Sequence, residues 1–310
     1  FPTVESPNPE ERSAMKMAIE LAESEKAEVV LATDPDADRI GMALRDENGQ
    51  YVLLNGNQTC SLLVYYIVKR WSELGRLRGK EYIVKTIVTT ELVARIAESF
   101  GVRHFDCLTG FKYIARIIRN NEGKATYIGG GEESFGYLAG DYVRDKDGVS
   151  ACSLAAEAAA WVRDTMGISL YEWLKQLYVK YGFYQEGLVS VVRTGKEGAE
   201  LIQRMMVDYR ANPPKEILGS PVVKINDIQT LESFDVRTGK KTHLEQDKSN
   251  VLQWYTEDGT RVCVRPSGTE PKIKFYFGVK AALPSVADYE KVRAELNDKI
   301  EWIKKELKLV

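Results

Sequence analysis

The middle of the chain alternates between short apolar segments and amphipathic segments, and this alternation restricts the possible folds more than any other feature. From residue 56 to about residue 181, segments typical of strands, such as "EYIVKTIV" (81–88), are followed by segments typical of helices, such as "TTELVARIAESF" (89–100). Strands that alternate with helices in this way build a largely parallel sheet. Ligands of such sheets bind beyond the carboxyl ends of the strands, so the loops that follow the strands are candidate sites.

The segment before this alternation predicts a helix, a strand and a hairpin. Asn8 can cap a helix and Pro9 suits the first helical position, so we expect the first helix to begin there. The apolar run "EVVLAT" (28–33) predicts a strand. The segment "IGMALRDENGQYVLL" (40–54) predicts two strands that turn at Asn48-Gly49, because Asn-Gly is a strong hairpin signal.

The last part of the chain, from about residue 183, has a different pattern. Strand-like runs predominate, and two helices are interspersed among them, the last at about 286–307. This pattern predicts a smaller α+β domain. The strand-like runs are 188–193, 221–225, 251–255, 260–264 and 272–279. We therefore expect three parts of the chain, with the boundaries 1–55, 56–182 and 183–310.

The bulk properties of the chain argue against several classes of function. The net charge is −2 over 310 residues, which favours neither a nucleic-acid binder nor a protein that binds membrane surfaces, and it predicts no particular oligomeric state. No apolar run approaches the roughly 20 residues that span a bilayer. The cysteines are scattered without a C-x-x-C motif, which predicts free thiols in a reducing cytoplasm. They are Cys60, Cys107, Cys152 and Cys263.

A loop with three aspartates follows the first predicted strand. Asp34, Asp36 and Asp38 occupy alternate positions in "DPDADR" (34–39), between two predicted strands. Three neighbouring like charges repel one another unless a cation lies between them or all three face water. Carboxylate oxygens are preferred ligands of Mg²⁺ and Ca²⁺. We therefore predict a metal site, and the structural alternative is a solvated acidic turn.

Two known types of loop share part of this pattern, but other positions argue against both. An EF-hand needs Gly at its sixth position and Glu at its twelfth, where this chain has Arg39 and Arg45. A haloacid-dehalogenase phosphatase also has a strand followed by Asp-x-Asp, but it needs Thr or Val where this chain has Asp38. Three carboxylates from one loop would leave positions on Mg²⁺ open for water or phosphate.

A second loop combines glycines with acidic and hydroxyl side chains. It lies in "GGGEESFGYLAGDYVRDKDG" (129–148), where consecutive glycines let the backbone approach a ligand closely. A carboxylate accepts two hydrogen bonds, so Glu132 could hold two neighbouring hydroxyl groups of a sugar, with Ser134 beside it. The structural alternative is a glycine-rich turn with exposed acids.

A third loop carries an arginine and two hydroxyl groups between two predicted strands. In "RPSGT" (265–269), Arg265, Ser267 and Thr269 surround Gly268, whose neighbouring backbone N–H groups can bind an anion. The fork of a guanidinium group matches the oxygens of phosphate. This loop predicts a phosphate site, with a polar hairpin tip as the structural alternative.

Together, the three loops resemble the α-D-phosphohexomutase family, which includes phosphoglucomutases and phosphomannomutases. The motifs D-P-D-A-D-R, G-E-E-S-F-G and R-P-S-G-T-E-P occur here in the order and at the separation found in the family. The stretch "GEESFGYLAGDYVRDKDG" (131–148) is most similar to the phosphoglucomutase branch. The resemblance implies phosphohexomutase-type α/β/α domains followed by an α+β C-terminal domain that is similar to the TATA-binding protein.

The resemblance also implies a role for each candidate residue. Arg39 would lie beside the phosphate being transferred, and Glu132 and Ser134 would hold sugar hydroxyls. Lys112, in "TGFKYIA" (109–115), matches an active-site lysine of the branch, and its structural alternative is a surface lysine. The implied Mg²⁺ ligands are Asp34, Asp36 and Asp38. The implied anchors of the non-reacting phosphate are Arg265, Ser267, Gly268 and Thr269.

The implied reaction interconverts hexose 1-phosphate and hexose 6-phosphate, with Mg²⁺ as cofactor and a glucose 1,6-bisphosphate-type activator. A phosphoserine of the enzyme gives its phosphoryl group to the substrate, and the resulting bisphosphate returns its other phosphate to the serine. The family's segment around that serine is similar to Thr-Ala-Ser-His-Asn-Pro, but neither His104 nor His243 follows a serine. We therefore expect the chain to begin inside the second of four family domains and to be inactive by itself.

Three other functions fit the same loops. A phosphopentomutase or a sugar-bisphosphate synthase of the same family would share the motifs, and the preference for glucose or mannose depends on details that the motifs do not contain. A non-catalytic module that binds sugar phosphates is a different class, in which the acidic loop would be structural. An upstream Ser-His-Asn-Pro-like segment in the parent gene would distinguish an enzyme from such a module.

Overall fold

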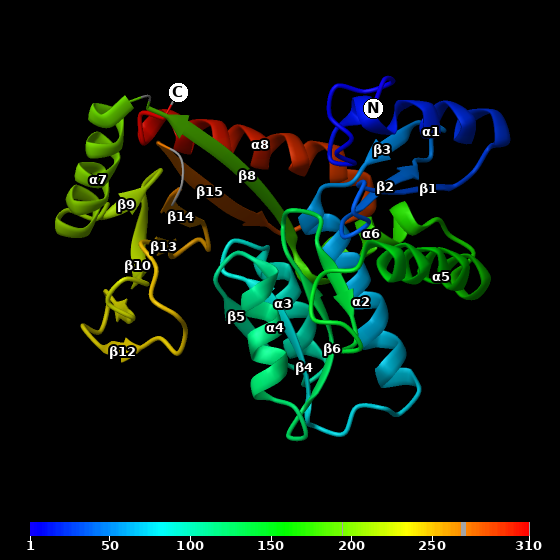
Figure 1. Cartoon of the computed structure of the whole chain (residues 1–310), viewed down its shortest axis with the longest axis horizontal. Helices are drawn as coiled ribbons and strands as arrows, with labels where there is room; N and C mark the ends of the chain where they lie inside the picture. The colour runs from blue at the N-terminus through cyan, green and yellow to red at the C-terminus, as the bar shows by residue number, and fades with distance from the viewer. Residues whose placement is uncertain (194, 268–270, 310) are drawn as a thin grey trace. The chain divides into compact units, whose positions relative to one another are not determined.

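The alternating segments in the middle of the chain form a mixed four-stranded sheet in the computed structural model, which describes residues 1–193, 195–267 and 271–309. The strands lie in the spatial order β5 (Arg103–Cys107), β4 (Glu81–Thr86), β6 (Thr126–Gly131) and β7 (Tyr137–Ala139) (Figure 1). Strand β4 is parallel to both β5 and β6, which confirms the predicted alternation. Strand β7 was not predicted, because it has three residues and its pairing partner is the preceding strand β6.

The helices of this region begin where polar side chains satisfy their first backbone N–H groups. Asn55 and Gln58 form a reciprocal capping box at the start of the first of them. Asp147 accepts hydrogen bonds from the N–H groups of Val149 and Ser150, so the fourth helix begins at residue 148. The helices are α2 (Gly56–Glu73), α3 (Glu91–Ser99), α4 (Phe111–Asn120), α5 (Gly148–Met166) and α6 (Leu170–Tyr181).

A smaller antiparallel sheet precedes this region and carries the predicted hairpin. Its strands are β1 (Val29–Thr33), β2 (Ile40–Arg45) and β3 (Tyr51–Leu53). The predicted turn is confirmed, and Asp46 Oδ1 accepts hydrogen bonds from the N–H groups of Asn48 and Gln50 within it. Helix α1 (Arg12–Glu25) covers the sheet through a buried apolar face. That face consists of Met15, Ile19 and Ala22.

The prediction that α1 begins at Asn8 and Pro9 is wrong. The backbone oxygen of Asn8 accepts a hydrogen bond from the N–H of Glu11, and its side chain accepts one from the N–H of Glu10, so these residues form a separate turn. Pro9 is buried against strand β2, where a Cβ atom added to Gly41 would lie 2.5 Å from Pro9 Cβ. This packing holds Pro9 away from the helix, and α1 begins at Arg12.

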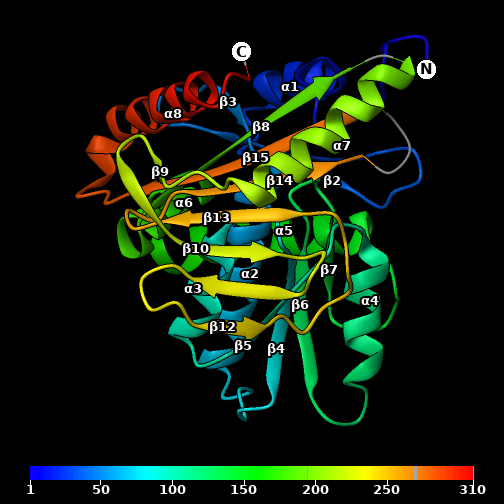
Figure 2. The same cartoon turned by 90° about the vertical axis from the view of Figure 1, so that its left-hand side faces the viewer.

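Residues Phe1–Tyr181 form one structural unit, and residues Gly182–Val310 form a second. The predicted boundary between residues 55 and 56 lies inside the first unit and stays a prediction. The second unit has one antiparallel sheet in the order β12-β11-β10-β13-β14-β15-β8, and β9 pairs with β10 (Figure 2). Its strands are β8 (Phe183–Val192), β9 (Glu216–Ile217), β10 (Ser220–Asp227), β11 (Glu232–Asp235), β12 (Lys241–His243), β13 (Leu252–Thr256), β14 (Arg261–Pro266) and β15 (Lys272–Ala281).

The helical elements of the second unit are α7 (Gly195–Ala211), the short η1 (Val286–Asp288) and α8 (Tyr289–Glu306). Helix α8 packs closely on β8, because a Cβ atom added to Gly187 would lie 2.9 Å from Ile300 Cγ2. Strand β8 begins five residues before the predicted 188, since Phe183–Gly187 pair with the end of β15. Among the helices described, none is long and apolar enough to cross a bilayer.

Candidate functional site

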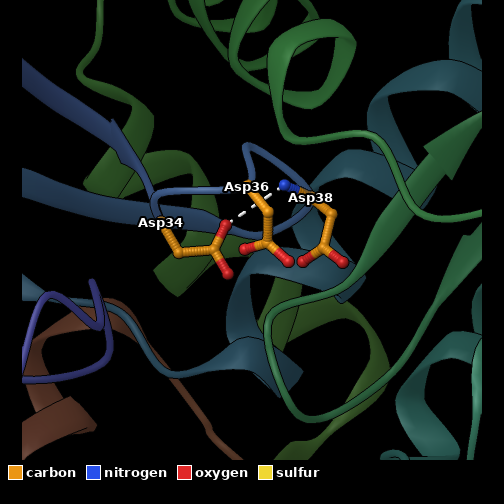
Figure 3. A group of neighbouring side chains, drawn as sticks. All are labelled: Asp34, Asp36 and Asp38. Carbon is orange, nitrogen blue, oxygen red and sulfur yellow. Dashed lines mark hydrogen bonds between the residues drawn. The ribbon is translucent and has the colours of Figure 1, made fainter.

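The acidic loop connects β1 to β2, and its shape is fixed by its first aspartate. Asp34 Oδ1 accepts hydrogen bonds from the backbone N–H groups of Asp38 (3.1 Å) and Arg39 (3.0 Å). The backbone oxygen of Asp34 accepts the N–H of Ala37, which has a left-handed φ of 58°. Figure 3 shows the carboxylates of Asp34, Asp36 and Asp38 pointing to the same side of the loop.

The three carboxylates form a donor set that fits a hard divalent cation. One carboxylate oxygen of each aspartate lies within 4.8 Å of the others. Asp36 is exposed, and Asp34 and Asp38 are half-buried, so the set is partly enclosed on one side and accessible on the other. Oxygen ligands of this kind suit Mg²⁺, and three of them from one loop leave positions for a substrate oxygen.

Arg39 directly follows Asp38 in the sequence, and its side chain lies beside the aspartates. Its Nε atom is 3.7 Å from Asp34 Oδ2 and 4.0 Å from Asp38 Oδ1. Its Nη1 donates a hydrogen bond of 2.9 Å to Glu10 Oε1, a residue that sequence reasoning missed. The guanidinium group is therefore oriented from two sides while it remains about one-third exposed.

The glycine-rich loop between β6 and β7 packs directly on the acidic loop. The N–H of Ile40 donates a hydrogen bond of 3.0 Å to the backbone oxygen of Phe135, and Arg39 and Gly136 form a β-bridge. A Cβ atom at Gly148 would lie 2.4 Å from the backbone oxygen of Arg39, so this position also needs glycine. The first two predicted loops therefore lie side by side, although they are far apart in the sequence.

Glu132 is buried at the base of the glycine-rich loop. Its Oε1 accepts a hydrogen bond of 2.7 Å from the N–H of Gly110, the residue that precedes α4. Burial raises the pKa of the Glu132 carboxyl, and the Gly110 N–H opposes part of that effect. A Cβ atom at Gly136 would lie 2.7 Å from Lys146 Cδ and 3.4 Å from Glu132 Oε2, so glycine there lets the side chain of Lys146 lie close to this carboxylate. Ser134 is half-buried in the adjacent turn.

We expect the substitution Glu132→Gln to stabilise the chain at neutral pH. A carboxyl whose pKa is raised by folding destabilises the folded state once the pH has risen through that pKa. Glutamine keeps an oxygen for the Gly110 N–H and carries no charge. The midpoint of thermal unfolding should therefore be higher for the variant at pH 7, and the difference should vanish below the ordinary pKa of 4.5. A lower midpoint at pH 7, with the exposed control Glu98→Gln unchanged, would contradict this expectation.

The neighbouring Glu133 ties the glycine-rich loop to the carboxyl end of β4. Thr86 Oγ1 donates a hydrogen bond of 3.0 Å to Glu133 Oε2, and Thr89 Oγ1 lies 3.5 Å from the same oxygen. The start of α2 contacts the same loop, since a Cβ atom at Gly56 would lie 2.0 Å from the backbone oxygen of Glu133. The loop is thus held beyond the carboxyl end of a parallel strand, where ligands of α/β sheets bind.

Lys146 is a functional candidate that sequence reasoning did not assign. Its ammonium group forms an ion pair with Asp38 and lies 3.7 Å from Asp145 Oδ1. Burial acts to lower the pKa of Lys146, but the hydrogen bond to Asp38 and the charges of Asp145, Asp38 and Glu132 together outweigh it, and the pKa is raised. The available signal was its place between two aspartates in "RDKDG" (144–148), a segment that is similar to the phosphoglucomutase branch.

The structure places Lys112 on the exposed side of α4. Its ammonium group lies 5.1 Å above the ring of Tyr113, and within the described ranges it forms no ion pair with the three aspartates. The role predicted for Lys112 therefore stays a prediction.

The third predicted loop lies in the second unit, between β14 and β15. Arg265 is half-buried, and its backbone lies opposite that of Lys274 in the antiparallel strand β15. The N–H of Ser267 donates a hydrogen bond of 2.8 Å to the backbone oxygen of Lys272. Gly268 and Thr269 lie outside the residues that the structure describes. The predicted phosphate-binding role of this loop stays a prediction.

Comparison with known families identifies the chain. Sequence models of the phosphoglucomutase/phosphomannomutase family match residues 1–49 (α/β/α domain II), 55–181 (α/β/α domain III) and 222–296 (C-terminal domain). The chain belongs to this family. The resemblance inferred from the three loops and the predicted fold class are thereby confirmed.

Curated relatives agree with this assignment. The phosphoglucomutase of Staphylococcus aureus strain MRSA252 is 36% identical over 297 residues, which cover 96% of this chain and 52% of the relative. The phosphoglucomutase of strain MSSA476 is 37% identical over 280 residues, which cover 90% of this chain and 50% of the relative. The chain thus spans about half the length of the curated relatives that it matches.

Solved structures support the same fold. A phosphoglucomutase/phosphomannomutase family protein from Burkholderia thailandensis has a TM-score of 0.58 at 17% identity, and the match covers 97% of this chain and 52% of that one. The phosphoglucomutase pp63/parafusin from Paramecium, in its open form, has a TM-score of 0.57 at 15% identity, and the match covers 89% of this chain and 46% of that one.

Proposed function

We propose that this chain forms the metal-binding and sugar-binding part of a phosphoglucomutase-type isomerase. The observation that carries the proposal is the contact between the acidic loop and the glycine-rich loop, through the hydrogen bond from Ile40 to Phe135 and the ion pair between Lys146 and Asp38. This contact would bring the proposed metal ligands and the proposed sugar-binding groups together in one site. Curated relatives named phosphoglucomutase support the reaction class.

The acidic loop would handle the phosphoryl group in transfer. Asp34, Asp36 and Asp38 would hold Mg²⁺, whose charge would neutralise the phosphoryl oxygens. Arg39, already oriented by Glu10, would donate hydrogen bonds to the same oxygens. The phosphoserine that exchanges its phosphoryl group with the sugar, and a glucose 1,6-bisphosphate-type activator, belong to the whole enzyme in this proposal.

The glycine-rich loop would hold the sugar. Glu132 is anchored by Gly110 through Oε1, so Oε2 is the oxygen that could accept sugar hydroxyls. Ser134 would add a hydroxyl contact. A carboxylate between two neighbouring hydroxyls can accept from either, which suits a substrate that binds in two opposite orientations.

Two further groups complete the proposal. The loop that begins with Arg265 and Ser267 would hold the phosphate that does not react, and Lys112 would polarise a phosphate or assist proton transfer. The three parts 1–55, 56–182 and 183–310 would correspond to the metal-binding, sugar-binding and phosphate-binding domains. The four thiols are free, which agrees with a reducing compartment, and cytoplasmic location is part of the proposal.

Calorimetry with glucose 6-phosphate and Mg²⁺ tests the proposal on the 310-residue chain. We expect millimolar binding, which Glu132→Ala and Arg265→Ala should each weaken at least about tenfold, since each removes a charged hydrogen-bonding group. The exposed control Glu98→Gln should bind like the parent. No binding by the folded parent chain would contradict the assignment of both loops. Turnover of glucose 1-phosphate by the purified chain would contradict its expected inactivity.

A further inference from the structure

Helix α4 carries a row of positive side chains along its exposed face. Lys112, Arg116 and Arg119 are spaced by four and three residues, so they project from the same side of the helix. All three residues are exposed. The opposite face packs into the core of the first unit through Phe111, Ile114 and Ile118. The row is therefore a surface feature that the packing of the helix does not require.

These side chains line a cavity of about 520 Å³. The segment after β7 provides the other wall, where Arg144 forms an ion pair with Glu122 and donates to the backbone oxygens of Asp141 and Val143. The guanidinium group of Arg144 is thereby fixed against the cavity. The lining consists of Lys112, Ala115, Arg116, Arg119, Glu122, Arg144 and Asp145.

Positive charge predominates in the cavity although the chain as a whole carries a net charge of −2. Both carboxylates of the lining already have cationic neighbours, because Glu122 pairs with Arg144 and Asp145 lies 3.7 Å from Lys146 Nζ. The charged groups of Lys112 and Arg116 lie 5.1 and 5.4 Å from the centre of the same ring, that of Tyr113. Arg119 makes no ion pair in the ranges that the structure describes.

We propose that this cavity is a binding site for a small phosphorylated molecule that carries two phosphate groups. Guanidinium groups bind phosphate oxygens through paired hydrogen bonds, and an anion would relieve the repulsion among the clustered cations. The cavity has the size of a small-molecule site, for which volumes of about 300–1,000 Å³ are usual. The row from Lys112 to Arg119 extends roughly 10 Å along the helix, which spans two phosphate groups rather than one.

This site goes beyond the proposed function, because Arg116, Arg119 and Arg144 have no role in the reaction described above. Lys112 belongs to both, so it is left unchanged in the test. Inorganic phosphate has the same phosphate chemistry as the proposed ligand, so its affinity is compared with that of a bisphosphate.

The test is calorimetry of the 310-residue chain with fructose 1,6-bisphosphate, pyrophosphate and inorganic phosphate as probes. The double variant Arg116→Gln/Arg119→Gln should bind the bisphosphate at least about tenfold more weakly than the parent, because it loses two charged hydrogen-bonding groups. The control Arg95→Gln/Arg103→Gln removes the same charge from exposed residues outside the cavity and should bind like the parent. If the double variant unfolds at a lower temperature than the parent, the single variants Arg116→Gln and Arg119→Gln are measured in its place.

The remaining arms separate this site from the proposed phosphate loop and identify the ligand. Binding of the bisphosphate should persist in Arg265→Gln. If Arg265→Gln loses this binding while Arg116→Gln/Arg119→Gln keeps it, the proposal is overturned. Equal affinity of parent and double variant, or no binding to the parent at millimolar concentration, would overturn it as well. Tighter binding of the bisphosphate than of inorganic phosphate supports the two-phosphate ligand, and equal binding of the two probes would overturn that assignment.

Discussion

The substitution Gly130→Ala is expected to destabilise the first unit by at least about 3 kcal/mol, which is the upper part of the usual range for overpacking. A Cβ atom at Gly130 would lie 1.9 Å from the backbone oxygen of Val84 and 2.9 Å from its backbone nitrogen. Val84 is the residue that Gly130 faces on the parallel strand β4, so neither atom can move away without breaking the pairing of the two strands. The strands β4 and β6 must therefore separate locally. This separation would also displace the end of β6, which leads to Glu132.

Thermal unfolding followed by circular dichroism measures this effect. A loss of about 3 kcal/mol corresponds to a midpoint roughly 6–12 °C lower for a unit of this size. Gly278→Ala is a matched control in a strand, because a Cβ atom there meets its nearest neighbour at 3.7 Å, an ordinary contact. A midpoint for Gly130→Ala within about 2 °C of the parent would show that β4 and β6 can move apart at little cost, and it would contradict the prediction.

The substitution Asp36→Asn is expected to weaken divalent metal binding roughly 100-fold, or by about 2.7 kcal/mol. Asp36 is the exposed member of the three aspartates, and it makes no hydrogen bond in the described part of the chain, so the change removes a ligand without disturbing the loop. Asp34 is different, because it also accepts the N–H groups of Asp38 and Arg39. Its replacement should change the shape of the loop as well as its charge.

Binding of Mn²⁺, followed by electron paramagnetic resonance, checks the prediction for Asp36. The exposed residue Asp208 of α7 provides a matched control, since Asp208→Asn removes the same charge elsewhere. Equal affinity of Asp36→Asn and the parent would identify the acidic loop as a solvated turn. We expect Asp208→Asn to keep the metal affinity of the parent and Asp36→Asn to lose it.

Features that depend on local chemistry were predictable from the sequence. The parallel sheet followed from the alternation of strands and helices, and the clustering of Asp34, Asp36 and Asp38 followed from their spacing in one loop. The start of α1 was not predictable, because the burial of Pro9 against Gly41 overrides a good local capping sequence. Strands β11 and β12 have no apolar alternation and form because β10 offers a free edge to β11.

Features that depend on contacts between distant residues were not predictable from the pattern alone. No periodicity connects Ile40 to Phe135, and only the family resemblance suggested that the two loops share a site. Lys146 looks like part of a solvated charge run until β7 reverses the chain and brings it to Asp38. The spacing of residues 112, 116 and 119 is enough to predict a positive row on one face of α4. The cavity could not be predicted in this way, because Arg144 comes from another segment.

The most direct test of the central claim, that the acidic and glycine-rich loops form one site, uses Mn²⁺ as a paramagnetic probe. Proton spectra of glucose 6-phosphate bound to the chain are recorded with Mn²⁺ and with diamagnetic Mg²⁺. We predict that Mn²⁺ selectively broadens the sugar resonances with the parent chain, and that the broadening is lost in Asp36→Asn, which should lose the metal, and in Glu132→Ala, which should lose the sugar. Binding of both ligands to the parent without any broadening would contradict the account.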